Sequence, residues 1–409
     1  MAWLTTPAHA RWLEQETDRL LEFGRGAVVP GGFARQDDEG RPQDGPLELW
    51  IACRMTHVYS IGHLLGRPGW APLVDHGLAA LRGLFHDDLH DGWFAEVDRD
   101  GTPHDDAKTA YPHAFVVLAA SSATAAGRPG ARELLDAALR VQEERFWDEQ
   151  AGMVVEQWDR SFTELDGYRG VNAVMHTVEA YLAAADVTGE RVWLDRALRM
   201  VERVVHGFAR DNGWRIPEHF DAAWSPQLDY NADTPAHPFR PFGATVGHWF
   251  EWARLTLHTR AALTARGEVA PAWMLEDATA LFDAATREGW AVDGAPGFVY
   301  TVDWSGRPVV RERMHWVAAE AAAAAAALHA ATGEARFDDW YTTWWEYIGT
   351  YLVDRAGGSW WHELGVDNTV SRTVWAGKAD LYHAVQATLI PRLPLAPALA
   401  PALAQGLPD

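Results

Sequence analysis

Apolar and polar positions along the chain repeat one pattern six times. In each repeat a glycine stands beside aromatic or apolar residues, a short strand-like stretch and a polar turn follow, and a long apolar helix comes next. The period is roughly 60 residues, with one longer interval in the fourth repeat. Because such units bury their apolar faces only against neighbouring units, the pattern predicts one repeat architecture. The marking glycines are Gly32, Gly92, Gly152, Gly213, Gly297 and Gly358.

Each repeat predicts two helices of different character. The first is apolar over most of its circumference, which is typical of a helix buried on all sides. The second is amphipathic, and Thr5–Gly24 supplies a further helix, so the pattern indicates a closed ring of twelve helices with a funnel at one end. The apolar helices are Leu49–His63, Ala114–Thr124, Val171–Ala185, His248–Leu263, Trp316–Ala330 and Leu381–Ile390, and the amphipathic ones include Glu133–Arg145, Arg191–Phe208, Glu276–Arg287 and Phe337–Tyr351.

Length and composition fit this interpretation. The chain has 409 residues, 48% hydrophobic and 22% charged, as expected of a globular protein. The even repeat predicts a single domain over residues 1–393. Residues 394–409 form an Ala/Leu/Pro-rich tail, which we expect on the surface without a helix of its own. The proline-rich stretch Asp229–Phe242 in the long fourth interval is expected to overhang the funnel.

Charge and cysteine content exclude several classes of partner. The net charge of −22 disfavours nucleic acids and anionic membranes, which require a basic surface. No run of 18 apolar residues predicts a membrane span, and Cys53 is the only cysteine, so we expect a cytoplasmic protein without disulfides. The aromatic residues of the last amphipathic helix allow a homo-oligomer, unless they pack between helices; they are Trp340, Tyr341, Trp344 and Trp345.

Polar and aromatic residues gather near the start of every apolar helix. Because those ends converge on the axis of a helical ring, these residues are the candidate site. A single histidine on a buried helix is usually a hydrogen-bonded core residue. Here all six repeats place polar residues at the same position of the apolar helix, and because unpaired buried polar groups are costly, this regularity indicates a functional site. The candidates are Trp50 and Arg54, Tyr111 and His113, Asn172 and His176, His248 and Glu251, Trp316 and Glu320, and Lys378, Asp380 and His383.

His248 and Glu251 stand three residues apart and share one helix face. A carboxylate beside an imidazole fixes its tautomer, which suits general acid–base catalysis, although a structural pair or a metal-ligand pair has the same spacing. No His-Glu-x-x-His motif, phosphate-binding loop, dinucleotide fingerprint or nucleophile elbow occurs. We therefore expect proton transfer on a small polar ligand, without cofactor or metal.

Several runs of sequence resemble the N-acylglucosamine 2-epimerase superfamily, and within it the aldose–ketose isomerase branch that includes mannose and sulfoquinovose isomerases. The resemblance extends over nearly the whole chain. It implies an all-α (α/α)6 barrel that interconverts an aldose and its ketose through a cis-enediol without a cofactor. The runs are Arg11–Arg19, Leu49–Arg54, Tyr168–Asn172 with Met175 and His176, Gly247–Trp252, Asp303–Pro308 and Lys378–His383.

The resemblance also implies roles for the candidate residues. His383 is expected to take and return the carbon-bound proton, and His248, steadied by Glu251, to act in ring opening and on the oxygens. Arg54 and His176 are expected to bind hydroxyls and the enediolate. The remaining expected sugar contacts are Trp50, Tyr111, Asn172, Trp316, Glu320, His362 and Lys378.

The substrate within the branch is open to alternatives. Pro238, His362 and Ala379 replace the polar or basic groups expected near a sulfonate, so we expect a neutral monosaccharide: mannose with fructose first, and lyxose with xylulose as a side activity. The alternatives are a sulfoquinovose isomerase, a glycoside hydrolase or lyase using Glu251 and Glu320, and a non-catalytic sugar-binding protein.

Overall fold

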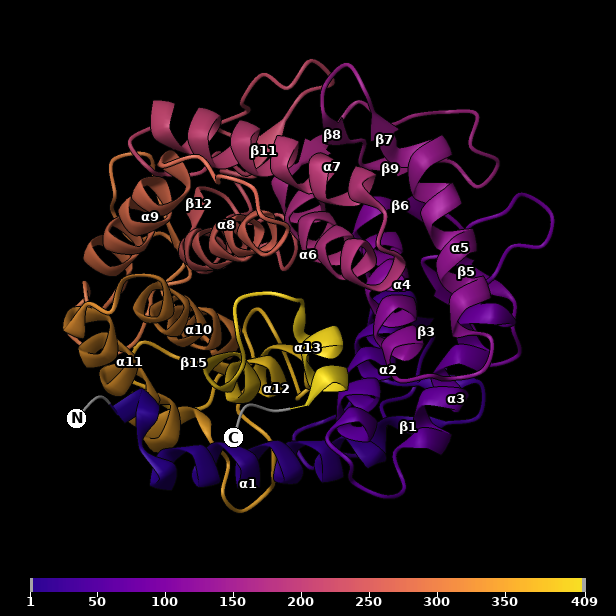
Figure 1. Cartoon of the computed structure of the whole chain (residues 1–409), viewed down its shortest axis with the longest axis horizontal. Helices are drawn as coiled ribbons and strands as arrows, with labels where there is room; N and C mark the ends of the chain where they lie inside the picture. The colour runs from indigo at the N-terminus through magenta and orange to yellow at the C-terminus, as the bar shows by residue number, and fades with distance from the viewer. Residues whose placement is uncertain (1–2, 407–409) are drawn as a thin grey trace. The chain divides into compact units, whose positions relative to one another are not determined.

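The computed structural model describes residues 3–406, and these divide into two compact units. The unit that we call the amino unit comprises Gly24–Met200, Ala379–Tyr382 and the segment from Pro397. The carboxyl unit comprises Val201–Lys378, His383–Ala396 and the first helix. Each unit is described by itself below, with the labels of Figure 1.

The helices of the amino unit alternate between buried and half-buried. α2, α4 and α6 are apolar almost all round and pack side by side, while α3 packs against α2 and α5 against α4 (Figure 1). The expected apolar spans are confirmed, with an additional turn at the amino end of α4. The amphipathic α5 and α7 end earlier than expected, at Val141 and Val201, and a π-helical stretch follows each. The bounds are α2 Leu49–Leu64, α3 Ala71–Arg82, α4 Ala110–Ala125, α5 Ala131–Val141, α6 Val171–Thr188 and α7 Arg191–Val201.

The carboxyl unit repeats this arrangement. α8 and α10 pack together, with α9 against α8 and α11 against α10. The run Ala321–Ala327 in α10 is buried throughout, because methyl side chains let neighbouring backbones approach closely. The bounds are α1 Pro7–Phe23, α8 Val246–Ala265, α9 Trp273–Gly289, α10 His315–Thr332, α11 Ala335–Tyr347 and α12 Tyr382–Leu389.

Short hairpins connect the helices and cap the buried ones. The strand before a buried helix pairs with the hairpin of the following repeat, as β3 does with β4, β6 with β9, β12 with β13 and β14 with β15. The first helical N–H then donates to a hairpin carbonyl, as Leu49 N does to Ala95 O at 3.0 Å and His315 N to His362 O at 3.0 Å. These bonds satisfy donors that a helix leaves unpaired, and they fix its first turn. The strands are β1 Val28–Val29, β2 Gly32–Phe33, β3 Leu47–Glu48, β4 Glu96–Val97, β5 Pro103–Asp105, β6 Lys108–Thr109, β7 Trp147–Asp148, β8 Met153–Val154, β9 Gln157–Trp158, β10 Arg169–Gly170, β11 His219–Phe220, β12 Ala244–Thr245, β13 Thr301–Val302, β14 Arg313–Met314 and β15 Glu363–Leu364.

The repeat glycines owe their place to backbone conformation. Their φ angles lie between 63° and 156°, a region that side chains disfavour. In three repeats an aspartate shortly before the glycine pairs with a buried cation beyond the hairpin, which ties the repeat together. These pairs are Asp87 with Lys108 at 3.1 Å, Asp293 with Arg313 at 2.6 Å and Asp354 with Lys378 at 2.6 Å.

The expectation of a helix-free surface tail is wrong. Leu399–Gln405 forms a further helix, α13, which packs against α2, α4 and α6. Its Ala400, Ala402 and Leu403 side chains are buried. Pro401 lies in the first turn, where the missing N–H has no helical partner to lose, so the proline-rich composition does not prevent a helix here.

Aromatic residues of α11 pack inside the carboxyl unit. Tyr341, Trp344 and Trp345 are at most 2% exposed, so these three belong to the core, and the homo-oligomer stays a prediction. Within residues 3–406, none of the helices is long and apolar enough to cross a bilayer.

Candidate active site

His248 lies in the first turn of α8 and is paired with a carboxylate. Its Nδ1 lies 2.9 Å from Glu218 Oε2, and the second oxygen of Glu218 accepts the backbone N–H of Thr245 at 3.1 Å. Both side chains are buried, with residue exposures of 8% and 4%. Since a carboxylate only accepts, we assign the proton to Nδ1, which leaves the Nε2 lone pair as the reactive position.

The expected partner of His248 was Glu251, and this expectation is wrong. Glu251 is fully buried one turn further along α8, and its Oε1 lies 3.5 Å from the guanidinium of Arg254. Arg254 continues the same helix face and was not among the candidate residues. The i, i+3 spacing put Glu251 on the face of His248, but the carboxylate contacts the cation.

His383 has the same kind of partner as His248. It lies in the first turn of α12, and its Nδ1 lies 3.2 Å from Glu320 Oε1. Glu320, on α10, is held in turn by Arg254, whose Nε donates to Oε2 at 2.8 Å and whose NH2 donates to Oε1 at 3.2 Å. The carboxyl unit therefore contains two imidazoles, each with a glutamate at Nδ1.

Trp316 brings the two histidines into one place. Its indole centroid lies 5.3 Å from the His248 ring and 5.6 Å from the His383 ring. Trp316 is half-buried, so it contributes an apolar surface of the kind that packs against the C–H face of a sugar.

His362 lies in the carboxyl unit, beside a histidine that the sequence did not single out. Its ring stacks on that of His315 at 3.9 Å and 14°, and the His315 ring meets the His383 ring edge-on at 6.4 Å. Two stacked imidazoles do not readily both carry a charge, because like charges repel at this distance. We therefore treat the pair as a neutral or singly charged surface.

Lys378 has a different place from the one expected of a sugar contact. Its ammonium is fully buried and donates to Asp354 Oδ2 at 2.6 Å and to Gly358 O at 2.8 Å. It occupies the position that Lys108 and Arg313 occupy in other repeats. Burial opposes the charge of Asp354, but the bonds from Lys378 and backbone N–H groups outweigh it and hold the pKa of Asp354 below its usual value. Lys378 therefore fits a structural role.

In the amino unit the candidates gather around Arg54 on α2. NH1 donates to Asp380 at 3.1 Å and NH2 to the Tyr111 hydroxyl at 2.8 Å. The guanidinium also lies over the rings of Phe115 and Tyr382, at 4.5 and 4.6 Å from their centroids. Burial opposes its charge, but Tyr111 and Asp380 outweigh that cost and hold the pKa of Arg54 above its usual value. Arg54 is a fixed cation, suited to oxygen atoms that carry developing charge.

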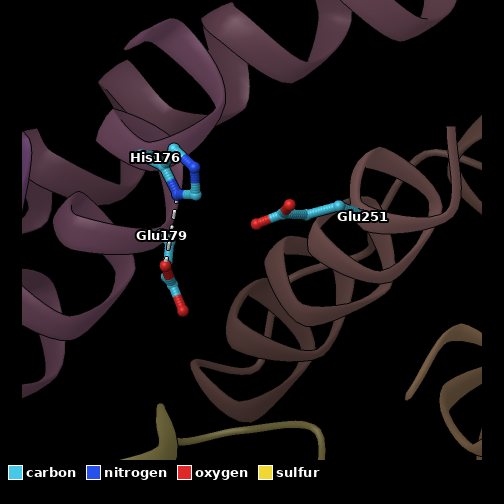
Figure 2. Close-up of side chains that lie close together, drawn as sticks. All are labelled: His176, Glu179 and Glu251. Carbon is cyan, nitrogen blue, oxygen red and sulfur yellow. Dashed lines mark ion pairs between the residues drawn. The ribbon is translucent and has the colours of Figure 1, made fainter. Parts of the chain in front are cut away.

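His176 and Glu179 lie one turn apart on α6, and Figure 2 shows the contact between them. The His176 Nδ1 lies 3.8 Å from Glu179 Oε2, and that oxygen also accepts a hydrogen bond from the Tyr382 hydroxyl. The His176 ring packs on Phe115 and Tyr111, at centroid distances of 4.7 and 5.2 Å. His176 is 4% exposed, so its ring position is set by these neighbours.

Three further candidates lie at helix starts in the same unit. Asn172 is half-buried in the first turn of α6. Trp50 is 8% exposed, its indole N–H donates to Glu48, and its ring centroid lies 4.9 Å from the Arg54 guanidinium. The third, His113, serves the core, because its two ring nitrogens bond Thr109 O at 2.7 Å and the N–H of Trp93 at 3.1 Å.

Ligand-type atoms of Glu251, Glu320 and His383 lie within 4.8 Å of one another, a spacing that a metal ion can bridge. The Arg254 guanidinium already lies against both carboxylates and supplies the positive charge. We therefore assign these residues to a charge-paired network and not to a metal centre.

Sequence reasoning missed Glu218, Arg254 and His315. Arg254 continues the His248 face of α8, but no comparable signal marks His315. A signal for Glu218 exists, because a glutamate follows the repeat glycine by four or five residues in several repeats. These residues are Glu96, Glu156, Glu218 and Glu363.

The helical repeats and the two glutamate-backed imidazoles define a protein suited to proton transfer on a small polar ligand. The family model for N-acylglucosamine 2-epimerase matches residues 31–387. A D-mannose isomerase of Thermobifida fusca is 53% identical over 98% of both chains, and one of Pseudomonas cannabina pv. alisalensis is 51% identical over 98% of this chain and 97% of its own. A crystal structure of D-mannose isomerase, 28% identical, superposes with a TM-score of 0.87 over 95% of this chain and 99% of its own.

The chain belongs to the N-acylglucosamine 2-epimerase family. The resemblance seen in the sequence is thereby confirmed, and so is the expected fold class, the (α/α)6 barrel.

Proposed function

We propose that the chain is an aldose–ketose isomerase that interconverts D-mannose and D-fructose. The observation that carries the proposal is the pair of imidazoles, His248 and His383, which lie against one indole with a glutamate at each Nδ1. Two general acid–base groups on one apolar surface fit a reaction that moves protons on adjacent carbons and their oxygens. Full-length relatives that carry the name D-mannose isomerase support this choice of substrate.

The reaction needs the sugar in its open form. His248 assists ring opening by exchanging protons with the ring oxygen and the anomeric hydroxyl. His383 Nε2 then removes the proton from C2 of the aldose, and the electron pair forms the C1–C2 double bond as negative charge develops on O1. In the resulting cis-enediolate, His248 Nε2 takes the proton of O2 and gives it to O1. The C2 carbonyl then forms, and His383 returns its proton to C1.

The fixed cation Arg54 is proposed to bind the oxygens that become negative, because electrostatic stabilisation of developing charge is usually a large part of catalysis. His176 and Tyr111, which belong to the same unit as Arg54, are proposed to bind hydroxyl groups. Asn172 and Trp50, at the starts of α6 and α2, complete the proposed sugar contacts of the amino unit.

A neutral sugar fits the surroundings better than a sulfonate. Lys378 is committed to Asp354, so it offers no charge to an anionic group. His362 is stacked on His315, and a charge on one ring disfavours a charge on the other.

A hydrolase fits the carboxylates poorly. Such an enzyme needs one protonated carboxylic acid as the general acid. Arg254 contacts both Glu251 and Glu320, at 3.5 and 2.8 Å, and a neighbouring cation favours the ionised form of each. The pair that the sequence offered for hydrolysis is therefore better suited to orienting other groups.

The experiment is incubation of the purified chain with D-mannose in the presence of EDTA, with fructose measured as the product. Parallel incubations with lyxose and sulfoquinovose rank the substrates, and a disaccharide tests for hydrolysis. Formation of no ketose from any of the three monosaccharides would reject the proposal. The cytoplasmic location expected from the sequence stays a prediction.

A further inference from the structure

Arg254 is a buried cation that no expected role accounts for. It is 2% exposed and follows Glu251 by one turn of α8. Its guanidinium forms two hydrogen bonds with Glu320, at 2.8 and 3.2 Å, and contacts Glu251 at 3.5 Å. The Glu320 oxygen that accepts at 3.2 Å is the same oxygen that lies against His383 Nδ1.

The cluster contains two buried carboxylates and one permanent positive charge. Carboxylates this close disfavour each other's ionisation in a buried place, and without a cation they tend to share a proton. A guanidinium stays charged at all accessible pH values and binds a carboxylate with two N–H groups. Arg254 is therefore the cation that holds the Glu320 carboxylate in its contact with His383.

We propose that Arg254 is a positioning residue that keeps Glu320 ionised, so that Glu320 holds His383 as the Nδ1–H tautomer with its lone pair on Nε2. This inference rests on the proposed function and deepens it, because it says how the proton-abstracting imidazole is kept ready. Arg254 acts through Glu320 and is not itself assigned a contact with the sugar.

Removal of the guanidinium changes the direction of one hydrogen bond. A proton shared by Glu251 and Glu320 resides part of the time on the Glu320 oxygen and is donated to His383 Nδ1. The imidazole hydrogen then lies on Nε2, and the base is lost. Titratable groups of the carboxyl unit near this place include His248 on α8, His315 on α10 and His362 next to β15, and an imidazole is not a permanent positive charge.

The test compares Arg254→Met, which removes the charge, with Arg254→Lys, which keeps it. For Arg254→Met we expect kcat to fall about 10²-fold at neutral pH with KM changed less than about threefold, since a proton-transfer group is impaired and no sugar contact is lost. The acid limb of its pH–rate profile should move upward by about one pH unit, because the shared proton must leave the carboxylates before Glu320 can accept the Nδ1–H of His383. Arg254→Lys should keep the limb near its wild-type position. An unmoved limb in Arg254→Met, or equal shifts in both variants, overturns the proposal.

A charge-balanced variant tests the electrostatic cause. In Arg254→Met/Glu251→Gln the competing carboxylate is absent, so Glu320 ionises more readily and the acid limb should return part of the way. This double variant also buries fewer charges, which favours folding. Arg313→Met, which breaks an equally buried pair with Asp293, is the control for general destabilisation and should leave the limb unmoved. A limb that moves as far in Arg313→Met contradicts the proposal.

A second readout does not depend on turnover. Nitrogen NMR with labelled histidine should show His383 as the Nδ1–H tautomer in the wild type and as the Nε2–H tautomer in Arg254→Met. The same tautomer in both proteins overturns the inference about Arg254 even where isomerase activity is present. Conversely, a wild-type chain that isomerises no sugar refutes the proposed function, while the tautomers still decide the role of Arg254.

Discussion

His248 and His383 pack against the same indole, that of Trp316, with ring centroids 5.3 and 5.6 Å from it. They come from α8 and α12, and each has a glutamate at Nδ1, Glu218 and Glu320 respectively. Both imidazoles therefore have a fixed tautomer, and each can act as base or acid at Nε2 without reorientation. The proposed isomerisation uses this arrangement, with one group serving carbon and the other oxygen.

Substitution of Glu218 should impair His248. In Glu218→Gln the side chain offers both a donor and an acceptor, so the tautomer of His248 is no longer fixed, and we expect kcat to fall by about 10²-fold. The measurement is steady-state kinetics with mannose, together with the rate of sugar ring opening followed by NMR. Both rates should fall, because His248 is proposed to act on the ring oxygen.

Glu251→Gln is the matched comparison for Glu218→Gln, because the sequence made Glu251 the partner of His248. It should leave the His248 tautomer unchanged, since Glu251 contacts Arg254 instead. Nitrogen NMR of labelled histidine measures the tautomer directly. A changed tautomer in Glu251→Gln with an unchanged one in Glu218→Gln would contradict the pairing of His248 with Glu218.

Substitution of Lys378 should affect stability and not sugar binding. Lys378→Met leaves Asp354 buried without its cation, and breaking a buried pair costs about 3–5 kcal/mol. Lys108→Met breaks the corresponding pair with Asp87, which keeps a second cation, Arg160, at 2.8 Å, and is the control. Urea unfolding should show a loss in both variants, larger in Lys378→Met, with KM for mannose unchanged in each. A higher KM in Lys378→Met alone would restore the role that the sequence predicted for Lys378.

The sequence predicted the helices well because their signal is local. A helix that is apolar all round, such as α2 or α10, stands out from its neighbours, and the repeat glycines mark where each unit begins. The same phase places His248, Glu320 and His383 near the starts of their helices. Site residues whose placement depends only on helix phase and repeat position could therefore be predicted from the sequence.

The contacts of the site were harder to predict because they join distant parts of the chain. Glu218 lies 30 residues before His248, in a hairpin, and only the pairing of β12 with the following hairpin and the bond to Thr245 place it there. Lys378 looked like a site residue because it precedes His383 closely. Its true partner, Asp354, is recognised only when the Asp87–Lys108 pair of another repeat is compared.

His113 should make the protein less stable in acid. Burial, with the neighbouring Lys108, lowers its pKa from 6.5 to about 3, and Nε2 already accepts the N–H of Trp93. Below pH 6.5 the unfolded chain therefore binds a proton at His113 that the native chain does not bind. The free energy of unfolding is thus highest above that pH, as far as His113 is concerned, and decreases as the pH falls toward 3. At pH 5 the free energy of unfolding is lower by about 2 kcal/mol for this reason.

Urea unfolding at pH 7 and pH 5 measures this effect of His113. The wild type should lose stability between the two values, and His113→Gln, although less stable at pH 7, should lose less. His57, whose pKa burial lowers to about 4, acts in the same direction, so the slope is reduced and not abolished. An identical slope in His113→Gln would show that His113 does not carry the acid sensitivity assigned to it.

The last helix should stabilise the amino unit, although its sequence reads as a loose tail. Leu403 is 4% exposed on α13, which packs against α2, α4 and α6. Leu403→Ala should therefore lower the free energy of unfolding by about 2–4 kcal/mol, the cost of a cavity in a packed core. Gln405→Ala, at an exposed position of the same helix, is the control and should change it by less than about 0.5 kcal/mol. Equal and small effects of the two substitutions in urea unfolding would mean that α13 adds nothing to the core, as expected of a surface tail.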